Sequence, residues 1–135
     1  MKVKFKRLES YFSNPEVDTI KEFVNFLQKS LPLNKDTFVS FDEGRDGKMT
    51  TGVRRPNHHI HVLVKNRLLI DILRTLSHEW THEFQHQKMG LKDTEPIQDI
   101  GGPEENMANV LSGIFIKQFA KNFPKYKKVM FGEID

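Results

Sequence analysis

Two histidines and a glutamate in the middle of the chain have the types and the spacing of a hydrolytic metal site. The stretch begins at His78-Glu79 and reaches His82, which is the pattern His-Glu-x-x-His. Residues four apart on a helix lie on one face, roughly 6 Å apart along the axis, so two imidazoles can bind one zinc ion. The carboxylate of Glu79 projects beside that ion, where it can polarise a water molecule. The pattern therefore predicts His78 and His82 as zinc ligands and Glu79 as the base.

A third histidine, His86, continues the same spacing, but we do not expect it to bind the same ion. On a continuous helix His86 lies about 12 Å from His78 along the axis, which is too far for a shared ion. Zinc enzymes that use a third histidine turn the chain at a glycine first, and Phe84-Gln85 offers none. The third ligand is therefore expected from another part of the chain.

The motif lies on a long predicted helix that must hold it in place. Helical periodicity runs from about residue 67 to residue 89, and Gly90 is suited to the position just beyond the C-terminus. His78 and His82 lie beside an apolar arc of the helical wheel and not within it. That arc predicts a buried face made by Leu69, Ile72, Leu73, Leu76, Trp80 and Phe84. The motif is thus expected on the edge of a helix that is anchored in the core.

Two further helices are predicted on either side of the motif helix in the sequence. The first covers about 14–31, with Asn14 as its cap. The second covers about 103–121 and carries Glu104 and Glu105 in its first turn, where the helix dipole favours acidic side chains.

Three short strands are predicted between the first helix and the motif helix. They cover 37–41, 48–54 and 58–64. The intervening turn at 42–47 contains the hairpin dipeptide Asp46-Gly47 and lacks the spacing of a calcium loop. We therefore expect a small, mostly antiparallel three-stranded sheet in one α+β domain that covers residues 1–135.

The third predicted strand carries three histidines. His59 and His61 share one face of this strand, whereas His58 and Ile60 lie on the other face. Two histidines two apart on a strand can hold a metal, so His59 and His61 form a rival to the His-Glu-x-x-His site. Because no third ligand is evident nearby, a structural or substrate-facing role is the favoured interpretation.

The composition excludes several classes of protein. The 135 residues carry a formal net charge of +3 at pH 7 and include no cysteine, which excludes disulfides and thiolate metal sites. No apolar run approaches the roughly 18–20 residues of a membrane span, and no secretory signal is recognisable at the N-terminus. We therefore expect a cytoplasmic protein without a membrane partner.

Positive charge is concentrated near both ends of the sequence. Four basic residues lie between positions 2 and 7, and an acid-free run near the end contains Lys117, Lys121, Lys125, Lys127 and Lys128. The favoured interpretation of the second group is a solvated helix end and tail. The alternative is a patch for an acidic partner such as nucleic acid.

The motif and a later segment together resemble a known enzyme family. His78-Glu79-x-x-His82, followed by Glu105-x-x-Ala108-Asn109, resembles the gluzincin zinc metallopeptidases. In that family the third ligand is a glutamate on a later helix. The size and the order of elements resemble the minimal members, which are the minigluzincins and the short metallopeptidases of phages and mobile elements. The resemblance covers roughly residues 15–121 and implies a zincin-like fold.

The resemblance implies a role for each residue at a matching position. His78, His82 and Glu105 match the ligands of one Zn²⁺ ion per chain, and Glu79 matches the general base and acid. These residues would hydrolyse a bond in a peptide or protein substrate through a zinc-activated water. Asn109 resembles the residue that orients the first motif histidine through its other ring nitrogen. Glu105 is preferred over Glu104 because the ligand precedes a small residue, here Ala108, by three positions.

The residue that stabilises the oxyanion has no single counterpart in this chain. The candidates are His58, His59, His61 and Tyr126. The strand at 58–64 resembles the family's edge strand, which pairs with an extended substrate and would bring one imidazole near the cleft.

Two other functions are compatible with the same residues. One is a catalytically silent zinc-binding interaction module. The other is a nucleic-acid-associated protein that uses the lysine-rich C-terminal region. The metallopeptidase is the favoured interpretation.

Overall fold

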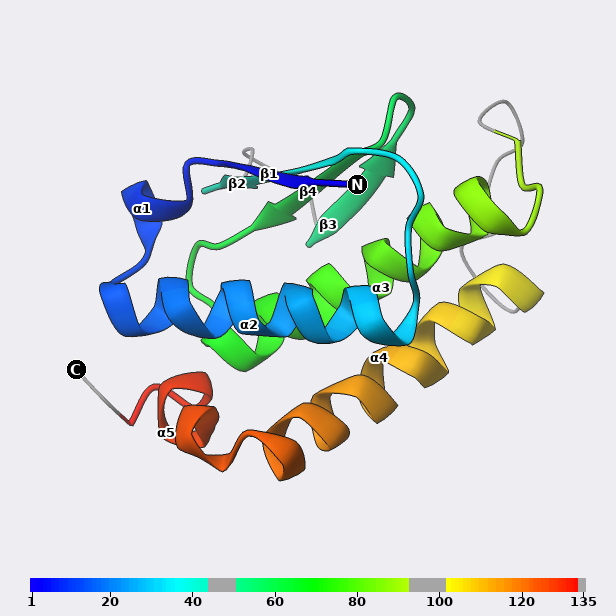
Figure 1. The fold of residues 1–135 in the computed structure, drawn as a ribbon. Coiled ribbons are helices and arrows are strands. Elements are labelled where there is room, and N and C mark those ends of the chain that lie inside the picture. Colours follow the sequence, from blue (N-terminus) through cyan, green and yellow to red (C-terminus); the bar gives the residue numbers. More distant parts are fainter. Residues whose placement is uncertain (44–50, 93–101, 134–135) are drawn as a thin grey trace.

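The chain folds into one four-stranded sheet with its helices gathered on one side (Figure 1). The computed structural model describes residues 1–43, 51–92 and 102–133. The strands are β1 (Val3–Lys6), β2 (Thr37–Asp42), β3 (Gly52–Arg55) and β4 (His59–Leu63). The long helices are α2 (Asn14–Ser30), α3 (Leu69–Lys88) and α4 (Pro103–Asn122), and the short ones are α1 (Leu8–Tyr11), η1 (Pro124–Tyr126) and α5 (Lys127–Met130). In outline this is the predicted α+β class. None of the helices in these described ranges is both long and apolar enough to cross a bilayer.

The sheet is mixed, and the prediction of a mostly antiparallel three-stranded sheet is wrong. The strand order is β1-β2-β4-β3, in which β1–β2 and β2–β4 are parallel and only β3–β4 is antiparallel. The fourth strand, β1, was not predicted because its alternating lysines resemble a solvated terminus. Its hydrogen bonds come from β2, more than thirty residues away, and no local pattern signals that pairing.

The predicted hairpin between the segments 37–41 and 48–54 is also wrong. The strand β4 lies between β2 and β3, so those two segments are not neighbours in the sheet. The Asp46-Gly47 turn and positions 48–50 lie outside the described residues. The antiparallel hairpin is instead β3–β4, and at its turn Asn57 and His58 have positive φ angles of 66° and 64°. An Asn in this conformation is common in tight turns.

The helices agree closely with the prediction. The helix α3 covers Leu69–Lys88, and Gly90 follows it with a φ of 78°, as the sequence predicts. The predicted cap of α2, Asn14, is wrong because Ser13 fills that position. The Ser13 hydroxyl accepts a hydrogen bond from the Glu16 backbone N–H, and the Glu16 carboxylate accepts one from the Ser13 backbone N–H.

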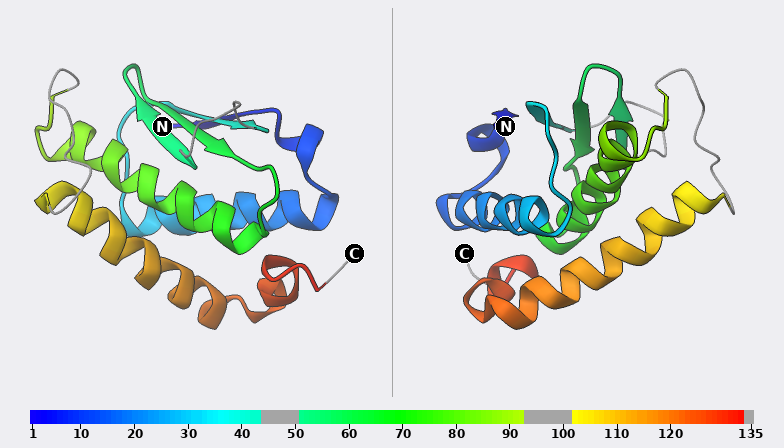
Figure 2. Two further views of the ribbon diagram at one scale, coloured as in Figure 1. Left: turned by 180° about the vertical axis from the view of Figure 1, so that it is seen from behind. Right: turned by 45° about the vertical axis from the view of Figure 1, so that its right-hand side comes forward.

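The helix α3 is enclosed by the sheet on one side and by α2 and α4 on the other (Figure 2). Five of the six apolar residues of its predicted buried face are buried, and Phe84 is partly buried. Trp80 is fully buried, and its indole N–H donates to the Leu31 carbonyl at the end of α2, at 3.0 Å. The motif helix is therefore fixed from both sides.

A buried carboxylate, Glu83, ties α3 to the β3–β4 hairpin. The Arg54 guanidinium Nε donates to Glu83 Oε1 at 2.6 Å, and His58 Nδ1 lies 2.7 Å from Glu83 Oε2. The Gln87 amide donates to the same Oε2 atom at 2.5 Å. The side chains of Arg54 and Glu83 are only 4% and 0% exposed, so water contributes little screening. This network holds β3 in position over α3.

We expect Glu83→Gln to lower the free energy of unfolding by about 3 kcal/mol, because it removes one charge of a buried pair while keeping the side-chain volume. Urea unfolding monitored by circular dichroism measures this change. The control Glu9→Gln alters an exposed acid of α1 and should stay within about 0.5 kcal/mol of the wild type. Equal stability of the two variants would show that the pair does not hold the hairpin.

Candidate metal centre

His78 and His82 on α3 meet Glu105 at the start of α4. His78 Nε2 lies 2.9 Å from Glu105 Oε1, and His82 Nε2 lies 3.0 Å from Glu105 Oε2. The two Nε2 atoms are 3.2 Å apart. Ligand atoms of three side chains on two adjacent helices thus lie within 4.8 Å of one another, and the packing of α3 on α4 brings them together.

The spacing of these atoms fits a metal ion. In a tetrahedral site with ligands at about 2.0–2.1 Å, neighbouring ligand atoms are roughly 3.3 Å apart. The two imidazole nitrogens are 3.2 Å apart, and they lie 2.9 and 3.0 Å from the two oxygens of the Glu105 carboxylate, which is close to that value. Two imidazoles and one carboxylate suit zinc and other divalent first-row metals, so the geometry alone does not select among them.

The hydrogen bond of His82 to Gln85 indicates that His82 Nε2, like the Glu105 carboxylate, is a hydrogen-bond acceptor. His82 Nδ1 lies 2.8 Å from Gln85 Oε1, an acceptor, so Nδ1 carries a proton. In the neutral imidazole the other nitrogen, Nε2, then presents a lone pair to the Glu105 carboxylate. Two acceptors at 3.0 Å repel each other unless a positive charge lies between them. The site therefore calls for either a further proton or a cation.

The pKa of His78 is lowered from its ordinary value, chiefly because burial disfavours the charged imidazolium. The neighbouring Glu105 carboxylate opposes this effect, and the charge of His82 adds to it. The neutral imidazole, which burial favours, is the form that binds metals.

Gln85 is a residue of the site that the sequence analysis did not identify. It is 1% exposed, and its amide nitrogen donates to the Glu104 carbonyl at 3.0 Å. One side chain thus orients the His82 ring and also holds the first turn of α4, next to Glu105. Its position three residues after His82 was the available signal, since side chains at i and i+3 are neighbours on a helix.

Glu79 lies beside the cluster, in the contact between α3 and β3. It is 8% exposed, and burial raises its pKa to about 8. The negative charge of Glu105 raises the pKa further, whereas a hydrogen bond from the Arg54 backbone N–H lowers it. The close approach depends on Gly52, where an added Cβ would lie 3.4 Å from Glu79 Cγ, 3.0 Å from the His61 carbonyl and in collision with the Thr75 side chain.

Asn109 and His86 do not take part in the cluster formed by His78, His82 and Glu105. Asn109 is exposed, and no hydrogen bond joins its side chain to His78 within the described ranges. The histidine partner that the structure does contain is Gln85, which contacts His82. His86 does not belong to the ligand cluster, in agreement with its distance along the helix.

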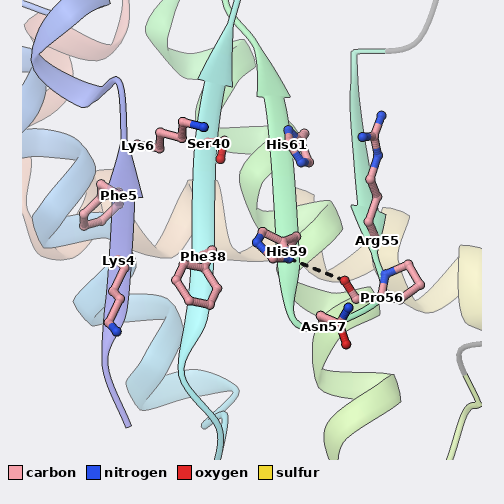
Figure 3. A pocket seen from close by; sticks show the side chains of 10 residues that line it. All are labelled: Lys4, Phe5, Lys6, Phe38, Ser40, Arg55, Pro56, Asn57, His59 and His61. Atoms are coloured by element: carbon pink, nitrogen blue, oxygen red, sulfur yellow. Dashed lines mark hydrogen bonds between the residues drawn. The ribbon is translucent and has the colours of Figure 1, made fainter.

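The four candidates for oxyanion stabilisation are not brought to the cluster. His58 contacts Glu83, whereas His59 and His61 lie on the opposite face of the sheet from α3 (Figure 3). Tyr126 follows α4 and stacks on Phe119, which lies 14 residues after Glu105 on that helix, or roughly 20 Å away by helical rise. The strand expected at the edge, 58–64, is central, and the neighbouring edge is formed by β3. His59 and His61 also lack a third ligand within the part of the chain that is described.

Comparisons of the chain with protein-family models, with characterised proteins and with solved structures found no significant match. The resemblance to the gluzincins therefore rests on the residues of the two motifs.

We expect Gln85→Leu to weaken zinc binding by 10- to 100-fold, because the variant leaves the His82 ring and the first turn of α4 without their shared partner. Competition with a chromogenic chelator measures the affinity. Gln118→Leu, which changes an exposed residue of α4, serves as the control and should bind zinc as the wild type does. Unchanged affinity in Gln85→Leu would remove Gln85 from the site.

Proposed function

We propose that the chain is a zinc metallopeptidase of the gluzincin kind. The observation that carries the proposal is the convergence of His78, His82 and Glu105 with the buried carboxyl of Glu79 next to them. Such a set combines a cation site with a proton acceptor that is not itself a ligand. In the resembled family this combination hydrolyses peptide bonds.

The number of ligands agrees with a catalytic zinc site. Structural zinc sites are closed by four protein ligands, whereas catalytic sites have three and keep one position open. Here three side chains converge, and those of His78 and Glu105 remain 20% and 18% exposed. The cluster is therefore accessible from one side, as a substrate requires.

The positions of the side chains indicate the role of each residue in the proposed hydrolysis. A zinc ion bound by the three ligands would act as a Lewis acid toward a water molecule and the scissile carbonyl. A bound cation would oppose the raised pKa of Glu79 and favour its carboxylate form, which would accept the proton of the attacking water and then deliver it to the leaving amine. The Arg54 backbone N–H keeps the Glu79 carboxylate in place, and Gln85 keeps His82 turned toward the site.

The position of β3 supports an extended substrate. It is the edge strand next to α3, and its Gly52 lies against Glu79. A peptide that paired with this edge would run past the proposed base, with its backbone amides held by hydrogen bonds. The sequence predicts this role for the strand at 58–64, but β4 is central in the sheet and β3 forms the edge, so we propose the role for β3.

We expect Glu79→Gln to retain one zinc per chain and to lose hydrolysis of an unfolded protein substrate, because the amide cannot accept a proton. His82→Ala and Glu105→Ala should lose both zinc and hydrolysis. Elemental analysis of protein purified without added metal, together with a casein cleavage assay, measures the two quantities.

The matched control is Glu104→Gln, which alters the acid next to Glu105 and should keep both zinc and activity. Full zinc content in Glu105→Ala would contradict the ligand assignment. Zinc binding without any cleavage that depends on Glu79 would instead identify a silent zinc module.

A further inference from the structure

The face of the sheet that points away from the helices has a regular composition. The register of the strands places side chains in two rows across this face. The first row consists of Lys4, Phe38, His59 and Arg55, and the second of Lys6, Ser40, His61 and Val53. No helix covers these rows within residues 1–43, 51–92 and 102–133 (Figures 1 and 2).

Aromatic rings occupy the centre of the first row. The rings of Phe38 and His59 are stacked, with centroids 4.8 Å apart and planes 17° apart. The His61 ring lies 6.3 Å from that of His59 and nearly parallel to it. Figure 3 looks onto this face and shows Phe38 and His59 side by side on the two central strands, with His61 further along β4. These rings are half-buried, and a planar ligand can stack on the ring faces that are not turned toward one another.

Cations flank the rings on both sides. Lys4 and Lys6 project from β1, with Lys4 Nζ 5.5 Å from the centroid of Phe38, and Arg55 projects from β3. Neighbouring strands are about 4.8 Å apart, so the first row extends roughly 14 Å from Lys4 to Arg55.

The charged residues that line the hollow on this face are positive. The described residues that line its hollow of about 490 Å³ include three cations and no acid. Asp42 lies at the far end of β2, where Arg7 neutralises it at 2.9 Å. The pKa of His61 is lowered by partial burial first and by the positive charge of Arg55 next, whereas the negative charge of Asp42 opposes this shift.

We propose that this outer sheet face binds single-stranded nucleic acid, with bases stacked on Phe38 and His59 and phosphates held by Lys4, Lys6 and Arg55. Sequence-tolerant binding of single strands uses this combination of a stacking platform and a positive groove. A duplex hides the faces of its bases, so it gains from the cations alone. An acidic peptide lacks planar groups in register with the rings.

The lysine-rich C-terminal region is a weaker candidate for the same partner. The hollow beside Lys125 and Tyr126 also contains Asp18 and Glu22 of α2. Those carboxylates would repel a phosphate backbone. We therefore prefer the outer sheet face to the C-terminal region as the surface that binds nucleic acid.

Fluorescence anisotropy with a labelled twelve-nucleotide oligo(dT) tests the proposal. We expect the single strand to bind at least tenfold more tightly than a duplex of equal length. Phe38→Ala and Phe38→Leu should each weaken binding about tenfold, since both remove the ring and only the second keeps an apolar side chain. Phe38 faces away from the core, and thermal unfolding checks that both variants fold.

Salt dependence separates the cations from the rings. Lys4→Gln combined with Lys6→Gln should reduce the slope of log K against log salt by roughly 1.4, or about 0.7 per contact, whereas the Phe38 variants should leave the slope unchanged. The charge-matched control, Lys125→Gln with Lys127→Gln, should bind as the wild type does. An oligonucleotide with 2-aminopurine should lose fluorescence on binding, and this signal should disappear in Phe38→Leu.

Three results would overturn the proposal. They are equal affinity for the duplex, loss of binding in the C-terminal control alone, or equally effective competition by an oligoglutamate of the same charge. The measurement requires no peptidase activity, so its outcome is independent of the proposed function.

Discussion

The enclosure of α3 on two sides is the constraint on which the rest of the structure depends. One side of the helix presents Glu79 and Glu83 to the sheet, and another presents His78 and His82 to α4. A single rigid element therefore fixes the relative positions of the ligand cluster, the proposed base and the edge strand. The buried Trp80 anchors α3 to the end of α2 and limits rotation of the helix between its neighbours.

The long-range contacts of the site come from polar residues that surround the motif. Arg54 takes part twice, because its backbone N–H holds Glu79 and its guanidinium pairs with Glu83. Gln85 likewise connects the orientation of a ligand to the start of the next helix. These contacts are buried or partly buried, where the loss of a hydrogen bond is costly. The cluster is thus positioned by bonds across elements as well as by the spacing within α3.

The helices could be predicted because their signals are local. The apolar arc of α3, the glycine that follows it and the proline at the start of α4 depend on residues within a few turns. The meeting of His78 and His82 follows from the same helical period. The placement of Glu105 required the family resemblance, since packing of α3 on α4 is not encoded by any pattern within either helix.

The sheet could not be predicted to the same extent, because strand order depends on contacts far apart in the sequence. The Asp46-Gly47 dipeptide favours a turn, but it does not determine whether β4 enters between the two flanking strands. The Lys4 and Lys6 pattern of β1 resembles a charged tail until β2 pairs with it. The same limit applies to the residue that orients a ligand histidine. The family pattern predicts Asn109 for this role, whereas in the structure Gln85 contacts His82.

The alternation of side chains along a strand separates the two proposed activities. Gly52 and Arg54 point toward α3, whereas Val53 and Arg55 point away from it. In β4, Ile60 and Val62 are fully buried against the helices, and His59 and His61 lie on the outer face. A one-residue change of register would exchange these sets, so the buried Arg54–Glu83 pair that fixes β3 over α3 also determines which residues the outer face displays. Two surfaces with different chemistry can therefore share four strands without sharing a side chain.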